Sequence, residues 1–412
     1  MVKKFFLLSS FIILCGLCFA QTTSLQYYID NGLRNSPLIK DYQNQVELSK
    51  YDSLLIKAAT RPQVTGSTFN SYAPVIKGFG YDGAITNGGN FTTVIGVNKP
   101  LPHKKNIAAQ FETLQLQNQE HINTSKLTEQ DLKRAIVAQY IAAYGSLQQL
   151  SFNKEINTLL TGQETVLKKL TQGNVYKQSD YLAFLVTMQQ QQLLIKQSAI
   201  QFKNDYATLN YLSGINDTVT VDLQKPDISL KTLPANISSV FFRQFEIDSL
   251  KLINSKNLVD VSYKPKINLF ADAGYNSSLA YQAYKNFGTS FGISASIPIY
   301  DGKQKKLQYS KINIAEKTRK NYQSFFTNQY RQQIAQLTQQ LNATDDLIND
   351  INYQLKYTQS LIDVNGKLLE AGEVRITDYV LGLNNYINAK NLITQNNIAR
   401  LQIINQINYW NR

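Results

Sequence analysis

Cysteine is nearly absent from this chain of 412 residues, and both copies, Cys15 and Cys18, lie close to the N-terminus. Two lysines, an apolar run and a small-residue site ending at Ala20 are typical of a secretory signal peptide. We therefore expect residues 1–20 to be removed, which leaves no thiol and excludes disulfides, thiol catalysis and cysteine metal ligands. A lipid anchor on Cys18 is the alternative, and the large Leu17 before it disfavours this.

Histidine is scarce too, and no catalytic motif is present. The two histidines, His103 and His121, lie too far apart on one predicted helix to share a metal ion, so surface or junction positions are favoured. Asp345, Asp346 and Asp350 form a carboxylate cluster, but no histidine or glycine-rich loop is near them in sequence, so a solvated helix face is the better interpretation. Nucleotide-binding, nucleophile-elbow and zinc-protease patterns do not occur. We therefore predict no enzyme, no cofactor and no metal.

Proline is missing from two very long stretches, 103–225 and 299–412. Apolar residues keep helical spacing in the first of them, as from Leu132 through Ile136 to Tyr140. About 67 helical residues would reach about 100 Å, which exceeds an ordinary globular domain. This length favours a coiled coil or a helical barrel.

One stretch, 287–299, alternates strictly between apolar and small residues. Phe287, Thr289, Phe291, Ile293, Ala295, Ile297 and Ile299 fall on one face, and only small residues fall on the other. This period of two predicts a β-strand with one apolar face. A strand that spans an outer membrane needs about 9–11 residues, so this one is long enough. We predict that its lipid-facing set includes Phe291, Ile293, Ala295 and Ile297.

The same order of elements occurs twice. A second alternating run at 91–97 also precedes a long proline-free stretch, and LTQGNVYKQSDYL (170–182) is similar to LEAGEVRITDYV (369–380). Landmarks that recur in one order predict an internal duplication. The predicted division is a first repeat 21–213, a linker or equatorial segment 214–235 and a second repeat 236–412. Within the repeats we predict β-hairpins at 62–100 and 265–300 and helical hairpins at 103–213 and 303–411.

Glycine marks the predicted turn of each helical hairpin. Gly173 and Gly372 are expected to adopt the left-handed conformation that ends a helix. Ser179-Asp180 and Thr377-Asp378 are expected to begin the helices that follow. The first turn has seven residues from Gly173 to Asp180, whereas the second has six from Gly372 to Asp378.

Basic residues outnumber acidic ones. Removing Lys3 and Lys4 from the 42 basic residues leaves 40 against 29 acidic residues, a net charge of +11. Such a balance can indicate a nucleic-acid partner. The export signal and the scattered positions of the lysines and arginines favour solvated helix faces instead, so we predict no nucleic-acid partner.

Four membrane-length strands cannot close into a barrel alone. Unpaired strand edges are not tolerated in hydrocarbon, and the smallest common barrels have about eight strands. The sequence therefore predicts an oligomer whose chains share one barrel in a membrane.

The duplicated order of helix, two strands, long helix, glycine turn and helix resembles that of the TolC-like outer-membrane efflux proteins. Asn35-Ser36-Pro37, the segment SIPIYDG at 296–302 and the paired glycine-to-aspartate turns are also similar. The resemblance implies a homotrimer with a twelve-stranded barrel in outer-membrane lipid and a periplasmic α-helical barrel. It also implies an exit duct for an efflux or type I secretion system, working with a periplasmic adaptor protein and an inner-membrane transporter.

The resemblance also assigns expected roles to residues of the turns. Gly173, Val175, Gly372 and Val374 are expected to contact the adaptor. Asp180 and Asp378 are expected to line the periplasmic aperture, and Leu381 stands where a second acidic residue can occur. The alternative function is a structural or adhesive coiled-coil surface protein, and the two predicted β-hairpins favour the channel because a stalk has no use for them.

Overall fold

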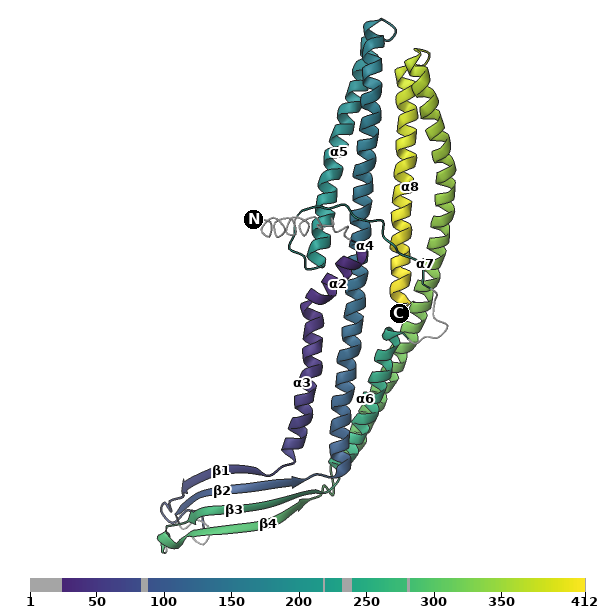
Figure 1. The fold of residues 1–412 in the computed structure, drawn as a ribbon. Coiled ribbons are helices and arrows are strands. Elements are labelled where there is room, and N and C mark those ends of the chain that lie inside the picture. Colours follow the sequence, from purple (N-terminus) through teal and green to yellow (C-terminus); the bar gives the residue numbers. More distant parts are fainter. Residues whose placement is uncertain (1–23, 83–87, 218, 232–238, 280–281, 412) are drawn as a thin grey trace, which may run out of the picture. The chain divides into compact units, whose positions relative to one another are not determined.

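The computed structural model describes residues 24–82, 88–217, 219–231, 239–279 and 282–411, so the predicted signal peptide and both cysteines lie outside the described residues (Figure 1). The helices are α2 (Leu25–Asn35), α3 (Pro37–Ala59), α4 (Lys104–Gln172), α5 (Gln178–Leu212), α6 (Val240–Ser262), α7 (Gln304–Glu370) and α8 (Ile376–Trp410), with a 3₁₀ turn η2 (Ala283–Lys285). The strands are β1 (Gln63–Tyr72), β2 (Gly89–Leu101), β3 (Lys266–Ser277) and β4 (Phe287–Ser296). The predicted mainly helical class with β-hairpins is confirmed.

The long helices follow from the absence of proline. Helix α4 has 69 residues and α7 has 67, and neither contains a proline, which would remove a backbone donor. Helix α3 begins at Pro37 as expected, and the backbone N–H of Ile39 donates to the Ser36 hydroxyl at 3.4 Å. None of the described helices contains a stretch of eighteen residues apolar enough to cross a membrane.

Two compact units make up the chain, and each takes segments from both predicted repeats. The turn unit comprises the N-terminal part up to Ile39, Lys126–Ser239 and Thr327–Arg412, and the sheet unit comprises Lys40–Ser125 and Val240–Phe326. Each unit therefore combines a segment of the first predicted repeat with a segment of the second.

The turn unit contains α5, α8, the C-terminal parts of α4 and α7, and the apolar clusters between them (Figure 1). The cluster nearest the turns includes Leu167, Phe184, Leu369, Tyr379 and Leu383, all buried. A second cluster surrounds the buried Tyr28 ring, whose hydroxyl lies 3.2 Å from that of Tyr206. Both clusters draw residues from distant parts of the chain, so the hairpins are held together by non-local apolar packing.

The sheet unit contains one four-stranded antiparallel sheet in the order β1-β2-β3-β4. Strand β4 ends at Ser296, which pairs with Lys266. The predicted placement of Ile297 in the strand was therefore wrong. Its partner would be Pro265, which has no N–H to donate, and Pro298 follows it directly, so the ladder cannot continue.

Candidate functional site

The sheet has one apolar and one polar face, and the strand register defines both. Residues directly opposite each other share a face, so Val64, Val97, Ala271 and Phe291 lie in one row across the four strands. Ile95, Leu269 and Ile293 lie on the same face, and Phe291 and Ile293 are 88% and 72% exposed. This row structure places three of the predicted residues, Phe291, Ile293 and Ala295, on one exposed apolar face. Exposure of this kind over a whole sheet face indicates an apolar partner or environment.

The opposite face is polar. Asp272 accepts a hydrogen bond from the Ser290 hydroxyl at 2.5 Å, and the Thr92 hydroxyl donates to Asn276 Oδ1 at 3.1 Å. Only a few large side chains lie here, and one of them, Phe270, covers the position where Gly292 has no side chain. An apolar face and a polar face on one sheet are the pattern found in barrel walls that separate lipid from a water-filled lumen.

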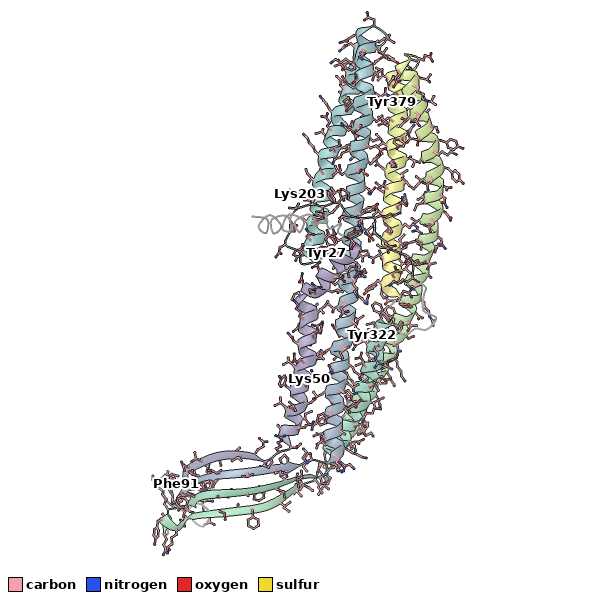
Figure 2. The ribbon with its side chains drawn as sticks, in the orientation of Figure 1. Tyr27, Lys50, Phe91, Lys203, Tyr322 and Tyr379 are labelled. Carbon is pink, nitrogen blue, oxygen red and sulfur yellow. The ribbon has the colours of Figure 1, made fainter. Side chains whose placement is uncertain are left out.

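Aromatic residues gather at the loop end of the apolar face. Tyr72, Phe91, Tyr275 and Phe287 all fall there by register, and Figure 2 labels Phe91 among them. The rings of Tyr275 and Phe287 meet edge to face at 5.2 Å. From residue 287 to residue 295 the strand rises roughly 27 Å. Aromatic girdles border the apolar band of outer-membrane barrels, which is about 25 Å tall before any allowance for strand tilt.

The two helix turns have the same backbone motif. In the second turn, Gly372 has φ +74°, its N–H bonds the Leu369 carbonyl at 3.1 Å, and the Glu373 N–H bonds that of Leu368 at 2.8 Å. This bonding pattern is a Schellman motif, which satisfies carbonyls at the end of a helix. The prediction of a left-handed glycine at position 372 is confirmed.

In the first turn the left-handed residue is Asn174, with φ 59°, and not Gly173 as predicted. The bonds from Asn174 N to Thr171 O at 3.1 Å and from Val175 N to Leu170 O at 2.9 Å repeat the same motif. Asparagine tolerates this conformation better than most residues, so a neighbouring glycine is not required. Counted from the left-handed residue, the aspartate follows six positions later in both turns, at Asp180 after Asn174 and at Asp378 after Gly372. The two turns therefore have the same length.

The predicted helix starts were also displaced. Lys177 and Arg375 precede α5 and α8 in extended conformation and make no side-chain cap. Asp180 and Asp378 lie in the first turn of these helices, where a negative charge is favourable. Ser179 bonds Asp180 at 3.3 Å instead of capping the helix, because both residues already lie inside it.

The two turns of one chain touch each other. The Tyr176 hydroxyl lies within hydrogen-bonding distance of the carbonyls of Leu369 (3.1 Å) and Val374 (2.8 Å). Burial raises the pKa of Tyr176, so its hydroxyl stays protonated and can donate. A Cβ on Gly372 would lie 2.9 Å from a methyl group of Val175. The predicted contact residues Val175, Gly372 and Val374 therefore form one surface, on which Val175 is exposed and Val374 is half-buried, while Gly173 is exposed beside it.

Replacement of Tyr176 by phenylalanine should loosen this connection. Removing the hydroxyl deletes the cross-turn hydrogen bond and leaves the two carbonyls without it, at a cost of about 1–2 kcal/mol. We expect faster amide hydrogen exchange near the second turn in Tyr176→Phe. The buried Tyr379→Phe variant of the same unit is the comparison for ring packing alone. Unchanged exchange in Tyr176→Phe would show that the hydroxyl does not hold the turns together.

Asp378 is not a free carboxylate. Arg375 holds it through two bonds, Nε to Oδ2 at 2.9 Å and a second guanidinium nitrogen to Oδ1 at 3.0 Å. The carboxylate raises the pKa of the Arg375 guanidinium, chiefly through these bonds. Asp180 has a lysine, Lys177, at the matching position, but the described residues contain no ion pair between these two. The predicted aperture residues therefore differ: Asp378 is neutralised locally, whereas Asp180 is not.

The remaining titratable candidates have local structural roles. His103 accepts the Lys105 N–H at 3.2 Å at the start of α4, and Asp345 pairs with Arg400. Asp346 and Asp350 are exposed. Among the described residues, no three histidine, cysteine, aspartate or glutamate side chains are grouped closely enough to hold a metal ion.

No family model and no curated protein match the sequence. The structure is similar to several solved outer-membrane proteins. The outer-membrane protein VceC of Vibrio cholerae matches with a TM-score of 0.74 at 10% identity, over 94% of this chain and 96% of that one. The CmeC outer-membrane channel of Campylobacter jejuni matches with a TM-score of 0.71 at 13% identity, over 94% of this chain and 85% of that one.

The open-state MtrE outer-membrane channel of Neisseria gonorrhoeae matches with a TM-score of 0.70 at 12% identity, over 94% of this chain and 88% of that one. Identities this low establish the fold alone. The coverage extends over nearly the whole of this chain, so both the sheet and the helical hairpins are part of the likeness. The chain therefore has the TolC-like fold of these outer-membrane channels.

Proposed function

We propose that the chain is the outer-membrane exit channel of an export system. Three copies share one barrel and pass substrates from an inner-membrane pump and a periplasmic adaptor to the exterior. The observation that carries this proposal is the exposed apolar face of a sheet whose outer strands, β1 and β4, both have an unpaired edge among the described residues. The proteins with similar folds are outer-membrane channels, which supports the proposed location.

The strand count supports three copies. Strands β1 and β4 run antiparallel to each other because an even number of strands lies in the sheet, so β4 of one copy can pair with β1 of the next. Two copies would supply eight strands, and a barrel of that size has an interior filled by side chains. Three copies supply twelve strands and leave room for a lumen lined by the polar face.

Helices α3 and α7, which connect to the edge strands β1 and β4, also have exposed apolar side chains. Exposed large apolar residues on these two helices within the sheet unit are Leu48, Tyr51, Leu54 and Leu55 on α3 and Leu307, Ile314, Tyr322 and Phe325 on α7. Helix α3 leads into β1 and α7 follows β4, so both ends of the sheet unit have unpaired strands and uncovered apolar side chains. Contact between neighbouring copies would cover both.

An export role also accounts for the turns. Their two motifs present matching backbone surfaces, and three copies would present six. In the proposed assembly they dock with the adaptor, and Asp180 and Asp378 line the aperture. A structural or adhesive stalk would need neither an apolar sheet face nor its polar reverse.

We expect Arg375→Gln to make the channel more selective for cations. Loss of the guanidinium would free the Asp378 carboxylate, and a ring of three carboxylates attracts cations. Asp378→Asn should have the opposite effect, because it leaves Arg375 uncompensated. The measurement is the reversal potential of single channels in a salt gradient. Identical reversal potentials in both variants and the original protein would place Asp378 away from the aperture.

The proposed function is tested by reconstitution. The full mature chain should insert into planar bilayers and give uniform conductance steps, and in cells it should fractionate with the outer membrane. An outer-membrane protein that never conducts would support the structural alternative, and a chain that does not fractionate with membranes would contradict the location.

A further inference from the structure

Basic residues gather where the helices meet the strands of the sheet unit. The basic junction cluster consists of Arg61, Lys99, Lys104, Lys105, Lys264, Lys266, Lys303, Lys305 and Lys306, which come from all four helix–strand connections. The same connections contain two carboxylates, Asp260 and Asp301. All members of the cluster are exposed except Lys305, which is half-buried. The prediction that the basic residues are scattered was therefore wrong for this part of the chain, where they are concentrated.

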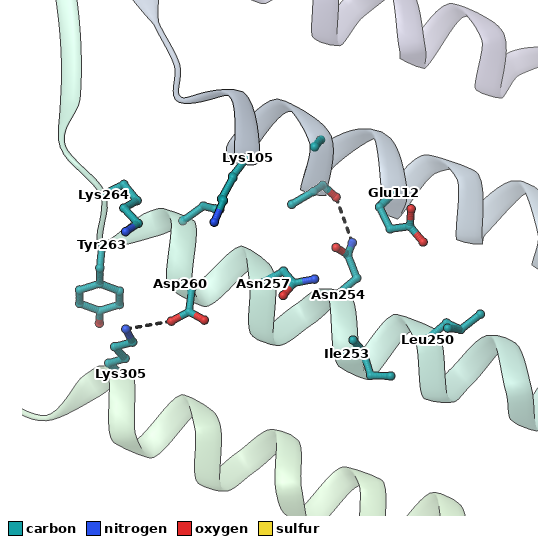
Figure 3. A pocket seen from close by; sticks show the side chains of 13 residues that line it. Lys105, Glu112, Leu250, Ile253, Asn254, Asn257, Asp260, Tyr263, Lys264 and Lys305 are labelled. Atoms are coloured by element: carbon teal, nitrogen blue, oxygen red, sulfur yellow. Dashed lines mark hydrogen bonds and ion pairs between the residues drawn. The ribbon is translucent and has the colours of Figure 1, made fainter.

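Three lysines of the cluster line one cavity of about 690 Å³ (Figure 3). Lys105 comes from α4, Lys264 from the connection between α6 and β3, and Lys305 from the start of α7, so the cavity exists only because three connections meet. Lys305 Nζ lies 2.9 Å from Asp260 Oδ1 and 5.4 Å from the centre of the Tyr263 ring. Among the described residues, neither of the other two lysines has a carboxylate within ion-pair distance. The cavity lining therefore has three lysines against two carboxylates, Asp260 and Glu112, which leaves an excess of one positive charge.

The rest of the cavity lining suits the boundary between water and hydrocarbon. Leu250 and Ile253 line it and are substantially exposed, and Tyr263 stands at its end. Lys99 of the same cluster is opposite Leu269 on the apolar face of the sheet. Long lysine side chains at such a boundary can cover apolar surface while the ammonium group stays in water, and tyrosine is favoured there as well.

The handedness of the chain places the cavity on the apolar side. The bond from Asn276 N to Asn286 O shows that residues of β3 on the polar face bond to β4. For L-residues this means that β4 lies to the right of β3 when the polar face is viewed with β3 running upward. Helix α6 lies between α4 and α7, just as β3 lies between β2 and β4. Asn254 of α6 bonds the Ala109 carbonyl of α4, and Asp260 of α6 pairs with Lys305 of α7. Because α6 is a right-handed helix, its residues Ile253 and Asn257 then point away from the polar side.

We propose that this cavity and the surrounding basic junction cluster bind the phosphate-bearing headgroups of anionic glycerophospholipids, in the leaflet next to the helices. The inference rests on the proposed insertion of the sheet into a membrane. Ammonium groups near a membrane surface attract anionic lipids, and basic pockets bind their headgroups. Leu250 and Ile253 would contact the start of the acyl chains. The bound lipids would fix the depth of the sheet in the membrane from the side opposite to the aromatic residues.

The test uses the full mature protein in detergent with equal amounts of dioleoyl phosphatidylglycerol and dioleoyl phosphatidylcholine, and native mass spectrometry counts the lipids retained. We expect the protein to prefer the anionic lipid. In Lys105→Gln/Lys264→Gln this preference should fall by about tenfold, because each basic residue near the surface contributes several-fold. The matched control is Lys77→Gln/Lys285→Gln, which removes the same charge from exposed sites at the loop end of the same unit. Its preference should not change.

An equal preference in the cavity variant and the original protein would overturn the proposal. A shift of ion selectivity toward cations without any loss of bound phosphatidylglycerol would also overturn it, since the lysines would then face the lumen. If the glutamine variant does not assemble, two other measurements decide. Lys105→Arg/Lys264→Arg should keep the preference, and raising the salt concentration should weaken it in the original protein; a preference that is independent of salt contradicts the proposal.

Two outcomes distinguish the lipid site from the channel itself. A trimer that conducts ions but shows no preference for phosphatidylglycerol would remove the lipid site alone. A chain that neither associates nor conducts would remove the proposed channel, and the lipid site with it.

Discussion

Replacing Ile293 by arginine should prevent most of the protein from inserting into membranes. Ile293 is 72% exposed on the apolar face of β4, opposite Leu269, and lies well inside the strand. An arginine on the lipid face of an outer-membrane barrel costs about 2–4 kcal/mol near the midplane of the bilayer. In the proposed barrel each of the three copies would bear this cost. The measurement is the free energy of folding into lipid vesicles, followed by urea titration.

Ser294→Arg is the matched control, because it adds the same side chain one residue further along the same strand. Ser294 lies on the polar face opposite Asn268, so its arginine should point into the lumen and keep its hydration. We expect near-normal insertion and a smaller single-channel conductance. Similar insertion defects in the two variants would show that the two faces of the sheet are not distinguished by lipid.

Bulky residues at the two turns should abolish export without disturbing the channel itself. Gly372→Trp is a poor test, since the left-handed backbone disfavours any side chain and a Cβ would collide with Val175. Gly173 and Ala371 are better positions, because both directly precede the left-handed residue and both are exposed. A Cβ on Gly173 would make only ordinary contacts, the nearest at 3.5 Å to the Lys169 carbonyl.

We therefore expect Gly173→Trp/Ala371→Trp to lower cross-linking to the proposed adaptor by at least about tenfold, while the proposed trimer still reaches the outer membrane. A closely packed interface has no space for six added indole rings, and a loss of 1.4 kcal/mol is already tenfold in affinity. Lys203→Trp, at an exposed position of α5 away from the turn, is the control and should export normally (Figure 2). Normal cross-linking in the double variant would mean that the adaptor binds elsewhere on the helices.

The elements that depend on local sequence could be predicted. The alternation of 287–296 and the lack of proline in the long helices each determine a structure within one segment, and both appear as expected. The turn at Asn174 was assigned to the wrong residue because two residues that tolerate left-handed backbone, Gly173 and Asn174, stand side by side. Only the backbone bonds to Thr171 and Leu170 distinguish them.

The features that depend on distant residues could not be predicted. Tyr176 and Leu369 are separated by 193 residues, so nothing near Tyr176 in the sequence indicates its partner. The basic junction cluster comes from four connections that only the folded sheet brings together. The available signal was that every helix–strand connection contains a lysine or an arginine. The four connections are far apart in the sequence, so these basic residues look scattered when charges are counted along the chain.

The most direct test of the account is the mass of the detergent-solubilised mature protein, measured by light scattering with the detergent contribution removed. The open edges of β1 and β4 and the uncovered apolar residues of α3 and α7 require partners, so we expect a stable species of three chains down to low protein concentration. Weakening those contacts, for example with Leu55→Glu on α3, should shift the mass toward one chain. A folded monomer in the unmodified protein would contradict the shared barrel, and with it the proposed channel.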